Sequence, residues 1–275
     1  MNQKLENLIN LLCKQNLSYY EFIAKASQIE EFSSIFDVRD LAMWQILGLD
    51  IRRNGSNEIE LNTRKRNIDE QIFCIVDIET SGGINSGQII EIGALKMQNG
   101  EEIERFETLV HATFIPENIS ALTGIRVEDL QGAPSLASVL EKFRLFLADS
   151  VFVAHNVKFD YGFVSASFEK FGLGVMLNRK ICTIDLARRT IPSLKYGLGA
   201  LKEVLGIQNT HHRAMNDAIA AAEIFKAAVK NTPSVVRYTE DLIEFSKTAN
   251  TVKRPTVSAQ TVINFEESIL QLYSL

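Results

Sequence analysis

A short acidic stretch at the end of an apolar run constrains the fold of this chain more than any other feature. Residues 72–76 are apolar and predict a buried strand, and Asp77 and Glu79 follow at its end. Side chains two positions apart on a strand share a face, so the two carboxylates should lie side by side. Two like charges there are costly unless a cation lies between them. A divalent metal ion would explain the pair, and so would a polar strand end that enters the turn at residues 81–83.

Length and composition fit a globular protein of one large domain or two smaller ones, since 46% of the 275 residues are hydrophobic and 23% are charged. No apolar run approaches the roughly 18 residues of a membrane span, and the apolar patch at residues 7–12 is too short for a signal peptide. Cys13, Cys74 and Cys182 are widely separated, which predicts reduced thiols. We therefore expect a cytoplasmic protein without a membrane partner.

The net charge of −5 argues against strong non-specific binding of duplex DNA, but a local metal site can still hold phosphates.

Residues 1–70 differ in pattern from the rest of the chain. Apolar residues at helical spacing predict helices near residues 5–12, 18–26 and 38–47. Two short strand patterns then flank residues 54–57, which predicts a hairpin. Three helices and a hairpin suit a small winged-helix module that binds DNA or a protein. A helical cap packed on the main domain fits the pattern equally well.

Residues 71–231 alternate between strand and helix patterns. We expect strands at 72–79, 88–97, 103–111, 151–154 and 181–184, and helices from 135, at 161–171 and at 214–229. An antiparallel opening followed by β-α-β units predicts an α/β fold with a mixed sheet flanked by helices. Residues 232–275 form a third segment, with a helix at 235–249, a polar tether at 250–259 and a more hydrophobic tail.

Two further carboxylates follow where the predicted elements would deliver them to the same edge of the sheet. Asp160 comes just after a buried strand, and Asp217 lies early in the alanine-rich last helix, five residues after His212. Four convergent carboxylates are a ligand set for hard cations such as Mg²⁺ or Mn²⁺. Two such ions about 4 Å apart can activate a water and stabilise the leaving oxygen of a phosphodiester. A nearby imidazole is then a natural general base.

These residues resemble, over about residues 70–230, the three motifs of the DEDDh 3′→5′ exonucleases. The matching segments are residues 77–80, residues 155–156 with Asp160, and residues 212–217, with supporting matches at 90–94, 122–125, 182–183 and 186–188. The resemblance implies a ribonuclease-H-like fold and two divalent metal ions, Mg²⁺ or Mn²⁺, held by Asp77, Glu79, Asp160 and Asp217. It implies His212 as the general base, because His212, unlike His211, stands four intervening residues before the aspartate. Ser81 replaces the second threonine of many members.

The resemblance also implies positions that line a substrate groove. These are Ile78, Thr80, Leu122, Thr123, Asn156 and Phe159. Leu122 is either a wedge that separates the last bases or a core leucine. His155 fits a structural role at a strand end better than a catalytic one.

Within the family, the domain most resembles the proofreading epsilon subunit of bacterial DNA polymerase III, although RNA-trimming members share much of the pattern. The tail resembles the Gln-x-x-aliphatic-x-Phe peptide that docks on sliding clamps, with Gln260, Ile263 and Phe265 as candidate contacts. A tether would raise its effective concentration, whereas the competing interpretation is simple packing of a terminal helix. The leading hypothesis is an exonuclease that acts on single-stranded or frayed DNA 3′ ends, with a polymerase catalytic subunit and a sliding clamp as partners. The alternatives are a stand-alone exonuclease that trims RNA 3′ ends or oligonucleotides, and a noncatalytic nucleic-acid or replisome binding protein.

Overall fold

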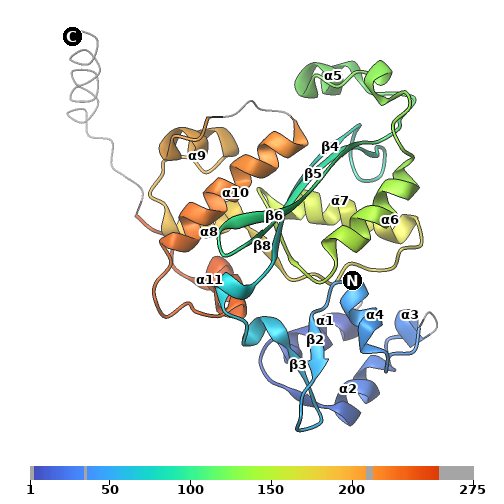
Figure 1. Ribbon diagram of the computed structural model, residues 1–275, viewed down its shortest axis with the longest axis vertical. Coiled ribbons are helices and arrows are strands. Elements are labelled where there is room, and N and C mark those ends of the chain that lie inside the picture. Colours follow the sequence, from blue (N-terminus) through green and yellow to red (C-terminus); the bar gives the residue numbers. More distant parts are fainter. Residues whose placement is uncertain (1–2, 34–35, 209–212, 254–275) are drawn as a thin grey trace.

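The computed structural model describes residues 3–33, 36–208 and 213–253, and it places a small N-terminal module below a larger α/β domain (Figure 1). The module contains a three-stranded sheet and the larger domain a five-stranded sheet. None of the described helices is long and apolar enough to cross a membrane.

The N-terminal module has the element order and the strand order of a winged helix. Its strands pair antiparallel in the order β1-β3-β2, so that the hairpin β2-β3 forms the wing. The elements are α1 (Gln3–Leu12), β1 (Leu17–Ser18), α2 (Tyr19–Ala26), α3 (Glu30–Ser33), α4 (Leu41–Ile46), β2 (Ile51–Arg53) and β3 (Glu58–Leu61). The predicted helices and hairpin are present, whereas the short β1 and α3 were not predicted. The Ser18 hydroxyl caps α2 by accepting from the Glu21 N–H.

The module is also packed on the main domain. Leu177 of the main domain belongs to the apolar core of the module, and its N–H donates to the Leu47 carbonyl at 2.8 Å. Arg144 is buried beside this contact. Its guanidinium donates to the Leu47 carbonyl and to the carbonyls of residues 173–175. A buried arginine that serves backbone carbonyls of both units makes this junction part of the folded core.

The main sheet has the strand order β6-β5-β4-β7-β8 and is mixed, as the sequence predicts. Its strands are β4 (Phe73–Thr80), β5 (Ile89–Gln98), β6 (Glu101–Leu109), β7 (Val151–Ala154) and β8 (Lys180–Cys182). The first three pair antiparallel, and β7 and β8 continue the sheet parallel to β4. The predicted strand at 181–184 is wrong at its end, because a helix begins at Thr183.

Helices cover both faces of this sheet (Figure 1). The helices of the main domain are α5 (Glu117–Thr123), α6 (Leu136–Leu147), α7 (Val157–Lys170), α8 (Thr183–Thr190), α9 (Leu198–Leu205), α10 (Ala214–Lys230) and α11 (Thr239–Thr248). Residues of α8, α10 and α11 share one apolar cluster with the sheet, and residues of α6 and α7 share another. Two predicted helix starts were wrong. Asn156, in the left-handed conformation, starts α7 four residues early, and α11 begins only at Thr239, where the Asp241 carboxylate accepts from the Tyr238 N–H.

Candidate active site

The carboxyl end of β4 carries the first two acidic residues. This strand lies at the centre of the sheet, between β5 and β7, and its apolar residues are buried on both faces. Asp77 and Glu79 are half-buried near its end, and Asp217 of α10 joins them. One oxygen of each of the three carboxylates lies within 4.8 Å of the others, which is close enough to share a metal ion.

Asp160, in the first turn of α7, is buried against the same strand. One of its carboxylate oxygens accepts a hydrogen bond from the Ile78 N–H at 3.3 Å. The Ile78 backbone lies between Asp77 and Glu79, so this bond brings the fourth carboxylate to the other three. The structure therefore gathers Asp77, Glu79, Asp160 and Asp217 from β4, α7 and α10 into one group, called here the carboxylate cluster.

Glu91 of β5 positions the helix that carries Asp217. It is 1% exposed, and one of its oxygens accepts from the Arg213 guanidinium at 2.7 and 3.0 Å. The other oxygen accepts from the Ala214 N–H, the first of α10, at 3.0 Å. A carboxylate at the start of a helix satisfies an otherwise unpaired N–H and interacts favourably with the helix dipole. Glu91 thus fixes the start of α10 and with it the position of Asp217.

Gly93 lets α10 approach the sheet. A Cβ at this position would lie 2.2 Å from the Met215 nitrogen, far inside contact distance. Gly93 pairs with Asp77 across β4 and β5, so this close approach occurs directly beside the cluster. The sequence identified residues 90–94 only as a supporting match. The sequence signal for a specific role of Glu91 and Gly93 was their presence in the otherwise apolar segment 89–94.

Burial and repulsion between carboxylates raise the pKa values of Asp77, Glu79 and Asp160. Burial, followed by the charges of Asp160, Asp217, Glu79 and Glu91, raises the pKa of Asp77 well above its ordinary value. Burial and then the charges of Glu91 and Asp217 raise the pKa of Glu79 to about 7, and burial raises that of Asp160 to about 8. The repulsion between buried carboxylates is reduced either when they bind protons or when a cation binds between them. An all-oxygen donor set with this excess of negative charge fits hard divalent ions, so the residues present fit the predicted metals.

His155 makes a structural contact at the end of β7. Its Nδ1 lies 2.8 Å from the Thr183 hydroxyl at the start of α8. Burial lowers its pKa to about 4, so the ring is neutral near pH 7. The predicted general base, His212, lies outside the described residues, as does His211. Arg213, the next residue in the chain, is held by Glu91 as described above.

The predicted substrate positions differ in exposure. Phe159 is 42% exposed on α7, and Asn156 is exposed at the start of this helix. Ile78 is buried, and its N–H is engaged by Asp160. The Thr80 hydroxyl donates to the Gly82 carbonyl at 2.9 Å, so it is tied into the turn after β4.

The two predicted positions on α5 point in different directions. Leu122 is 54% exposed, which excludes the core-leucine alternative. Thr123 is buried, and its hydroxyl donates to the Ile119 carbonyl and accepts from the Ile125 N–H. Its side chain thus shapes the end of α5. The predicted partner-binding residues Gln260, Ile263 and Phe265 lie outside the described residues.

Comparison with known protein families identifies the family of this chain. A family model described as exonuclease, RNase_T, matches residues 74–225. The chain belongs to this exonuclease family. This match covers all four carboxylates and confirms the resemblance to DEDDh-type exonucleases.

Known relatives connect the chain to DNA polymerase III. It is 35% identical over 209 residues to the PolC-type DNA polymerase III of Halalkalibacterium halodurans, covering 74% of this chain and 14% of the relative. It is 39% identical over 181 residues to that of Clostridium perfringens, covering 64% of this chain and 12% of the relative. The chain thus spans about a seventh or less of these relatives, and it is related to one part of a PolC-type polymerase.

Solved structures of Exonuclease I share the fold. The apo enzyme superimposes with a TM-score of 0.53 at 17% identity, over 64% of this chain and 44% of the other. The E. coli enzyme in complex with a dT13 oligonucleotide gives a TM-score of 0.52 at 17% identity, over 60% of this chain and 42% of the E. coli chain. These similarities confirm the predicted fold, a mixed sheet flanked by helices as in ribonuclease-H-like exonucleases.

Proposed function

We propose that this exonuclease is a metal-dependent 3′→5′ enzyme that hydrolyses DNA from its 3′ end and releases nucleoside monophosphates. The observation that carries the proposal is the convergence of Asp77, Glu79 and Asp217 within 4.8 Å, joined by Asp160 through the Ile78 N–H. The four side chains come from β4, α7 and α10. The Ile78 N–H holds Asp160, and Glu91 holds the start of the helix that carries Asp217, so these parts of the site are positioned before substrate arrives.

Two divalent cations bound by the cluster would activate a water and neutralise the leaving oxygen of the phosphodiester. Asp77, Glu79, Asp160 and Asp217 would hold them, and the rest of the reaction rests on side chains of this chain. His212 would take the proton of the attacking water as general base. Glu91 would hold the start of α10 and the preceding Arg213 in place.

Exposed apolar side chains on α7, which carries Asp160, and on α5 suit an unpaired end of a nucleic-acid strand. Phe159 and Leu122 are exposed apolar side chains on α7 and α5, and bases of a single strand stack on or pack against such surfaces. Exposed Asn156 adds hydrogen-bonding capacity beside Phe159. A frayed 3′ end offers such bases, whereas a matched duplex end must first unpair.

The relatives support a role in replication. The relatives are named as DNA polymerases. We therefore propose that this exonuclease works beside a polymerase catalytic subunit and removes mispaired nucleotides. The tail residues Gln260, Ile263 and Phe265 would then dock on a sliding clamp. A clamp pull-down tests this: the double variant Gln260→Ala/Phe265→Ala should be lost from the clamp, and equal retention with the unaltered chain would refute the docking.

Release of mononucleotides from three end-labelled substrates tests the activity. The substrates are a matched duplex, a duplex with a mismatched 3′ end, and an RNA strand, each assayed after chelation and after adding back Mg²⁺ or Mn²⁺. We expect fastest release from the mismatched end, only with metal, and immediate release of a 3′ label while a 5′ label stays on shortening strands. Preference for RNA would replace proofreading by RNA trimming, and no release from any substrate would refute the enzyme assignment.

A further inference from the structure

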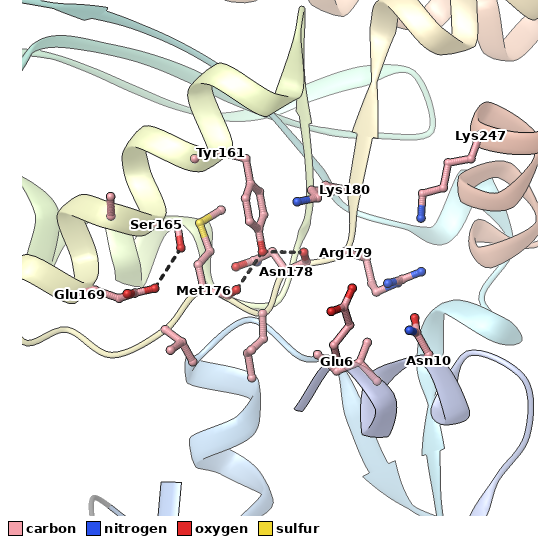
Figure 2. Close-up of a pocket in the computed structure, with 15 residues that line it drawn as sticks. Glu6, Asn10, Tyr161, Ser165, Glu169, Met176, Asn178, Arg179, Lys180 and Lys247 are labelled. Carbon is pink, nitrogen blue, oxygen red and sulfur yellow. Dashed lines mark hydrogen bonds between the residues drawn. The ribbon is translucent and has the colours of Figure 1, made fainter. Parts of the chain in front are cut away.

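A second candidate site lies where the N-terminal module meets the main domain (Figure 2). It is a cavity of about 470 Å³, called here the inter-module pocket, with walls from α1, α7, residues 175–180 and Lys247 of α11. Its volume lies in the range of small-molecule sites. None of the four cluster carboxylates lines it, so it is separate from the candidate active site.

The rear wall of this pocket is fixed by bonds inside the protein. The Tyr161 hydroxyl donates to the Met176 carbonyl at 2.8 Å, as Figure 2 shows, and lies 3.2 Å from the Asn178 carbonyl. The Asn178 amide donates to two carbonyls at the α6–β7 connection. Arg179 forms an ion pair with Glu240 of α11. These groups already have partners, so the wall keeps its shape without a ligand.

Lys180 and Lys247 also line the pocket, and they differ from the groups of the rear wall in their partners. The Lys180 ammonium lies 3.8 Å from the centroid of the Tyr161 ring, and Lys247 reaches toward the same space from α11 (Figure 2). Within the described part of the chain, neither lysine forms an ion pair with a carboxylate. Burial, followed by the nearby charges of Lys247 and Arg179, lowers the pKa of Lys180. The charge of Glu6 acts in the opposite direction on Lys180, and the charges of Glu240 and Glu244 do so on Lys247.

We propose that the inter-module pocket binds the phosphate group of a nucleotide between Lys180 and Lys247. The Asn10 amide of α1 lines the pocket and can donate to the same group or to the sugar. Hydrogen bonds from ammonium groups to phosphate are charge-assisted, and a phosphate relieves the repulsion between the lysines. The volume leaves room for a sugar and base beside the phosphate. The choice of a nucleotide over other anions rests on the proposed function, in which the enzyme releases nucleoside monophosphates.

Calorimetric binding in an inactive background tests the pocket without relying on turnover. The full chain carrying Asp217→Asn, kept in chelator, excludes metal-dependent binding at the cluster. The probes are inorganic phosphate, thymidine 5′-monophosphate and a thymidine tetranucleotide without a terminal phosphate. We expect binding of at least one probe, and a loss of affinity of about tenfold or more when Lys180→Met and Lys247→Met are combined. The matched control is Lys226→Met, a lysine of α10 paired at the surface with Glu223, which should bind unchanged.

The three probes also identify the source of the phosphate. Binding of phosphate and the monophosphate points to a free nucleotide, and binding of the tetranucleotide alone points to backbone phosphates of a longer strand. Removing two nearby positive charges offsets the loss of the Lys180 contact with the Tyr161 ring, so the melting temperature of the ligand-free protein should change little. If the double variant fails to fold, Lys247→Met alone should weaken binding about threefold. No binding of any probe at millimolar concentration, equal affinity in the lysine variants, or an equal loss in Lys226→Met would refute the proposal.

Discussion

The carboxylate cluster and the inter-module pocket are both groups of like charges, but the protein holds them differently. The carboxylates are on short side chains, and contacts with the backbone position Asp160 and the helix that carries Asp217. The Asp160 carboxylate accepts from the Ile78 N–H, and Glu91 accepts from the first N–H of α10. Lys180 and Lys247 are long, more exposed side chains from β8 and α11. A rigid buried group can impose a coordination geometry, whereas flexible lysines can only supply charge. We therefore expect strict chemistry at the first site and salt-sensitive binding at the second.

The largest expected effect comes from removing a cluster carboxylate. Asp77→Ala or Asp217→Ala should reduce nucleotide release to background, because each removes a proposed metal ligand, while circular dichroism remains that of the unaltered chain. The matched control is Asp185→Ala, which removes an exposed aspartate of α8 paired with Arg188 and should retain activity. Substantial release by either cluster variant would show that the carboxylates do not act as one metal site.

The next effect tests whether a base completes the rigid site. His212→Ala should lower the turnover rate by about 10²–10⁴-fold, the usual contribution of a positioned general base. His211→Ala serves as the neighbouring control and should cost much less. Pre-steady-state release of the first nucleotide is the measurement, because it isolates the chemical step. A rate equal to that of the unaltered chain would move the base to another residue.

Glu91→Gln tests whether backbone positioning accounts for the rigidity of the cluster. The amide loses the charged contact with Arg213 and presents an N–H₂ group or a weaker acceptor to the Ala214 N–H. We expect the free energy of unfolding to fall by about 1–3 kcal/mol and metal binding to weaken. Glu104→Gln, which breaks an exposed pair with Lys96, should cost about 1 kcal/mol or less. Urea titration and metal titration measure both effects. Equal metal affinity in Glu91→Gln would reduce this residue to a purely structural role.

The smallest expected effect is a pH dependence of the cluster in chelated protein. The folded pKa of Glu79 is about 7 and that of Asp160 about 8, both above their ordinary values. The folded protein therefore binds more protons than the unfolded chain between about pH 4 and 8, and the stability from these groups falls as pH rises through that window. Metal ions require the ionised carboxylates, so the gain in melting temperature on adding Mn²⁺ should grow from pH 5.5 to 8. A constant gain would contradict the raised pKa values.

Much of the fold and of the acidic site could be predicted because their signals are local. Continuous apolar runs predicted the strands β4 and β7, and the strand patterns at 88–97 and 103–111 predicted β5 and β6. The helices α5, α8 and α9 were missed. Each is seven or eight residues long, too short for a periodic pattern to stand out from a loop. The start of α7 was misplaced because a left-handed Asn156 lets a helix follow a strand without a loop.

The sequence by itself determined the residue types of the candidate active site, because each carboxylate lies in a short motif next to a strand or helix start. Tertiary structure alone decided how they are held: Glu91 reaches Ala214 across 123 positions, and Gly93 admits the backbone of α10. It also decided that the N-terminal module packs on the main domain. The inter-module pocket joins α1, α7, β8 and α11, which have no common motif. Local patterns encode elements, whereas contacts between residues distant in sequence arise only when the elements pack.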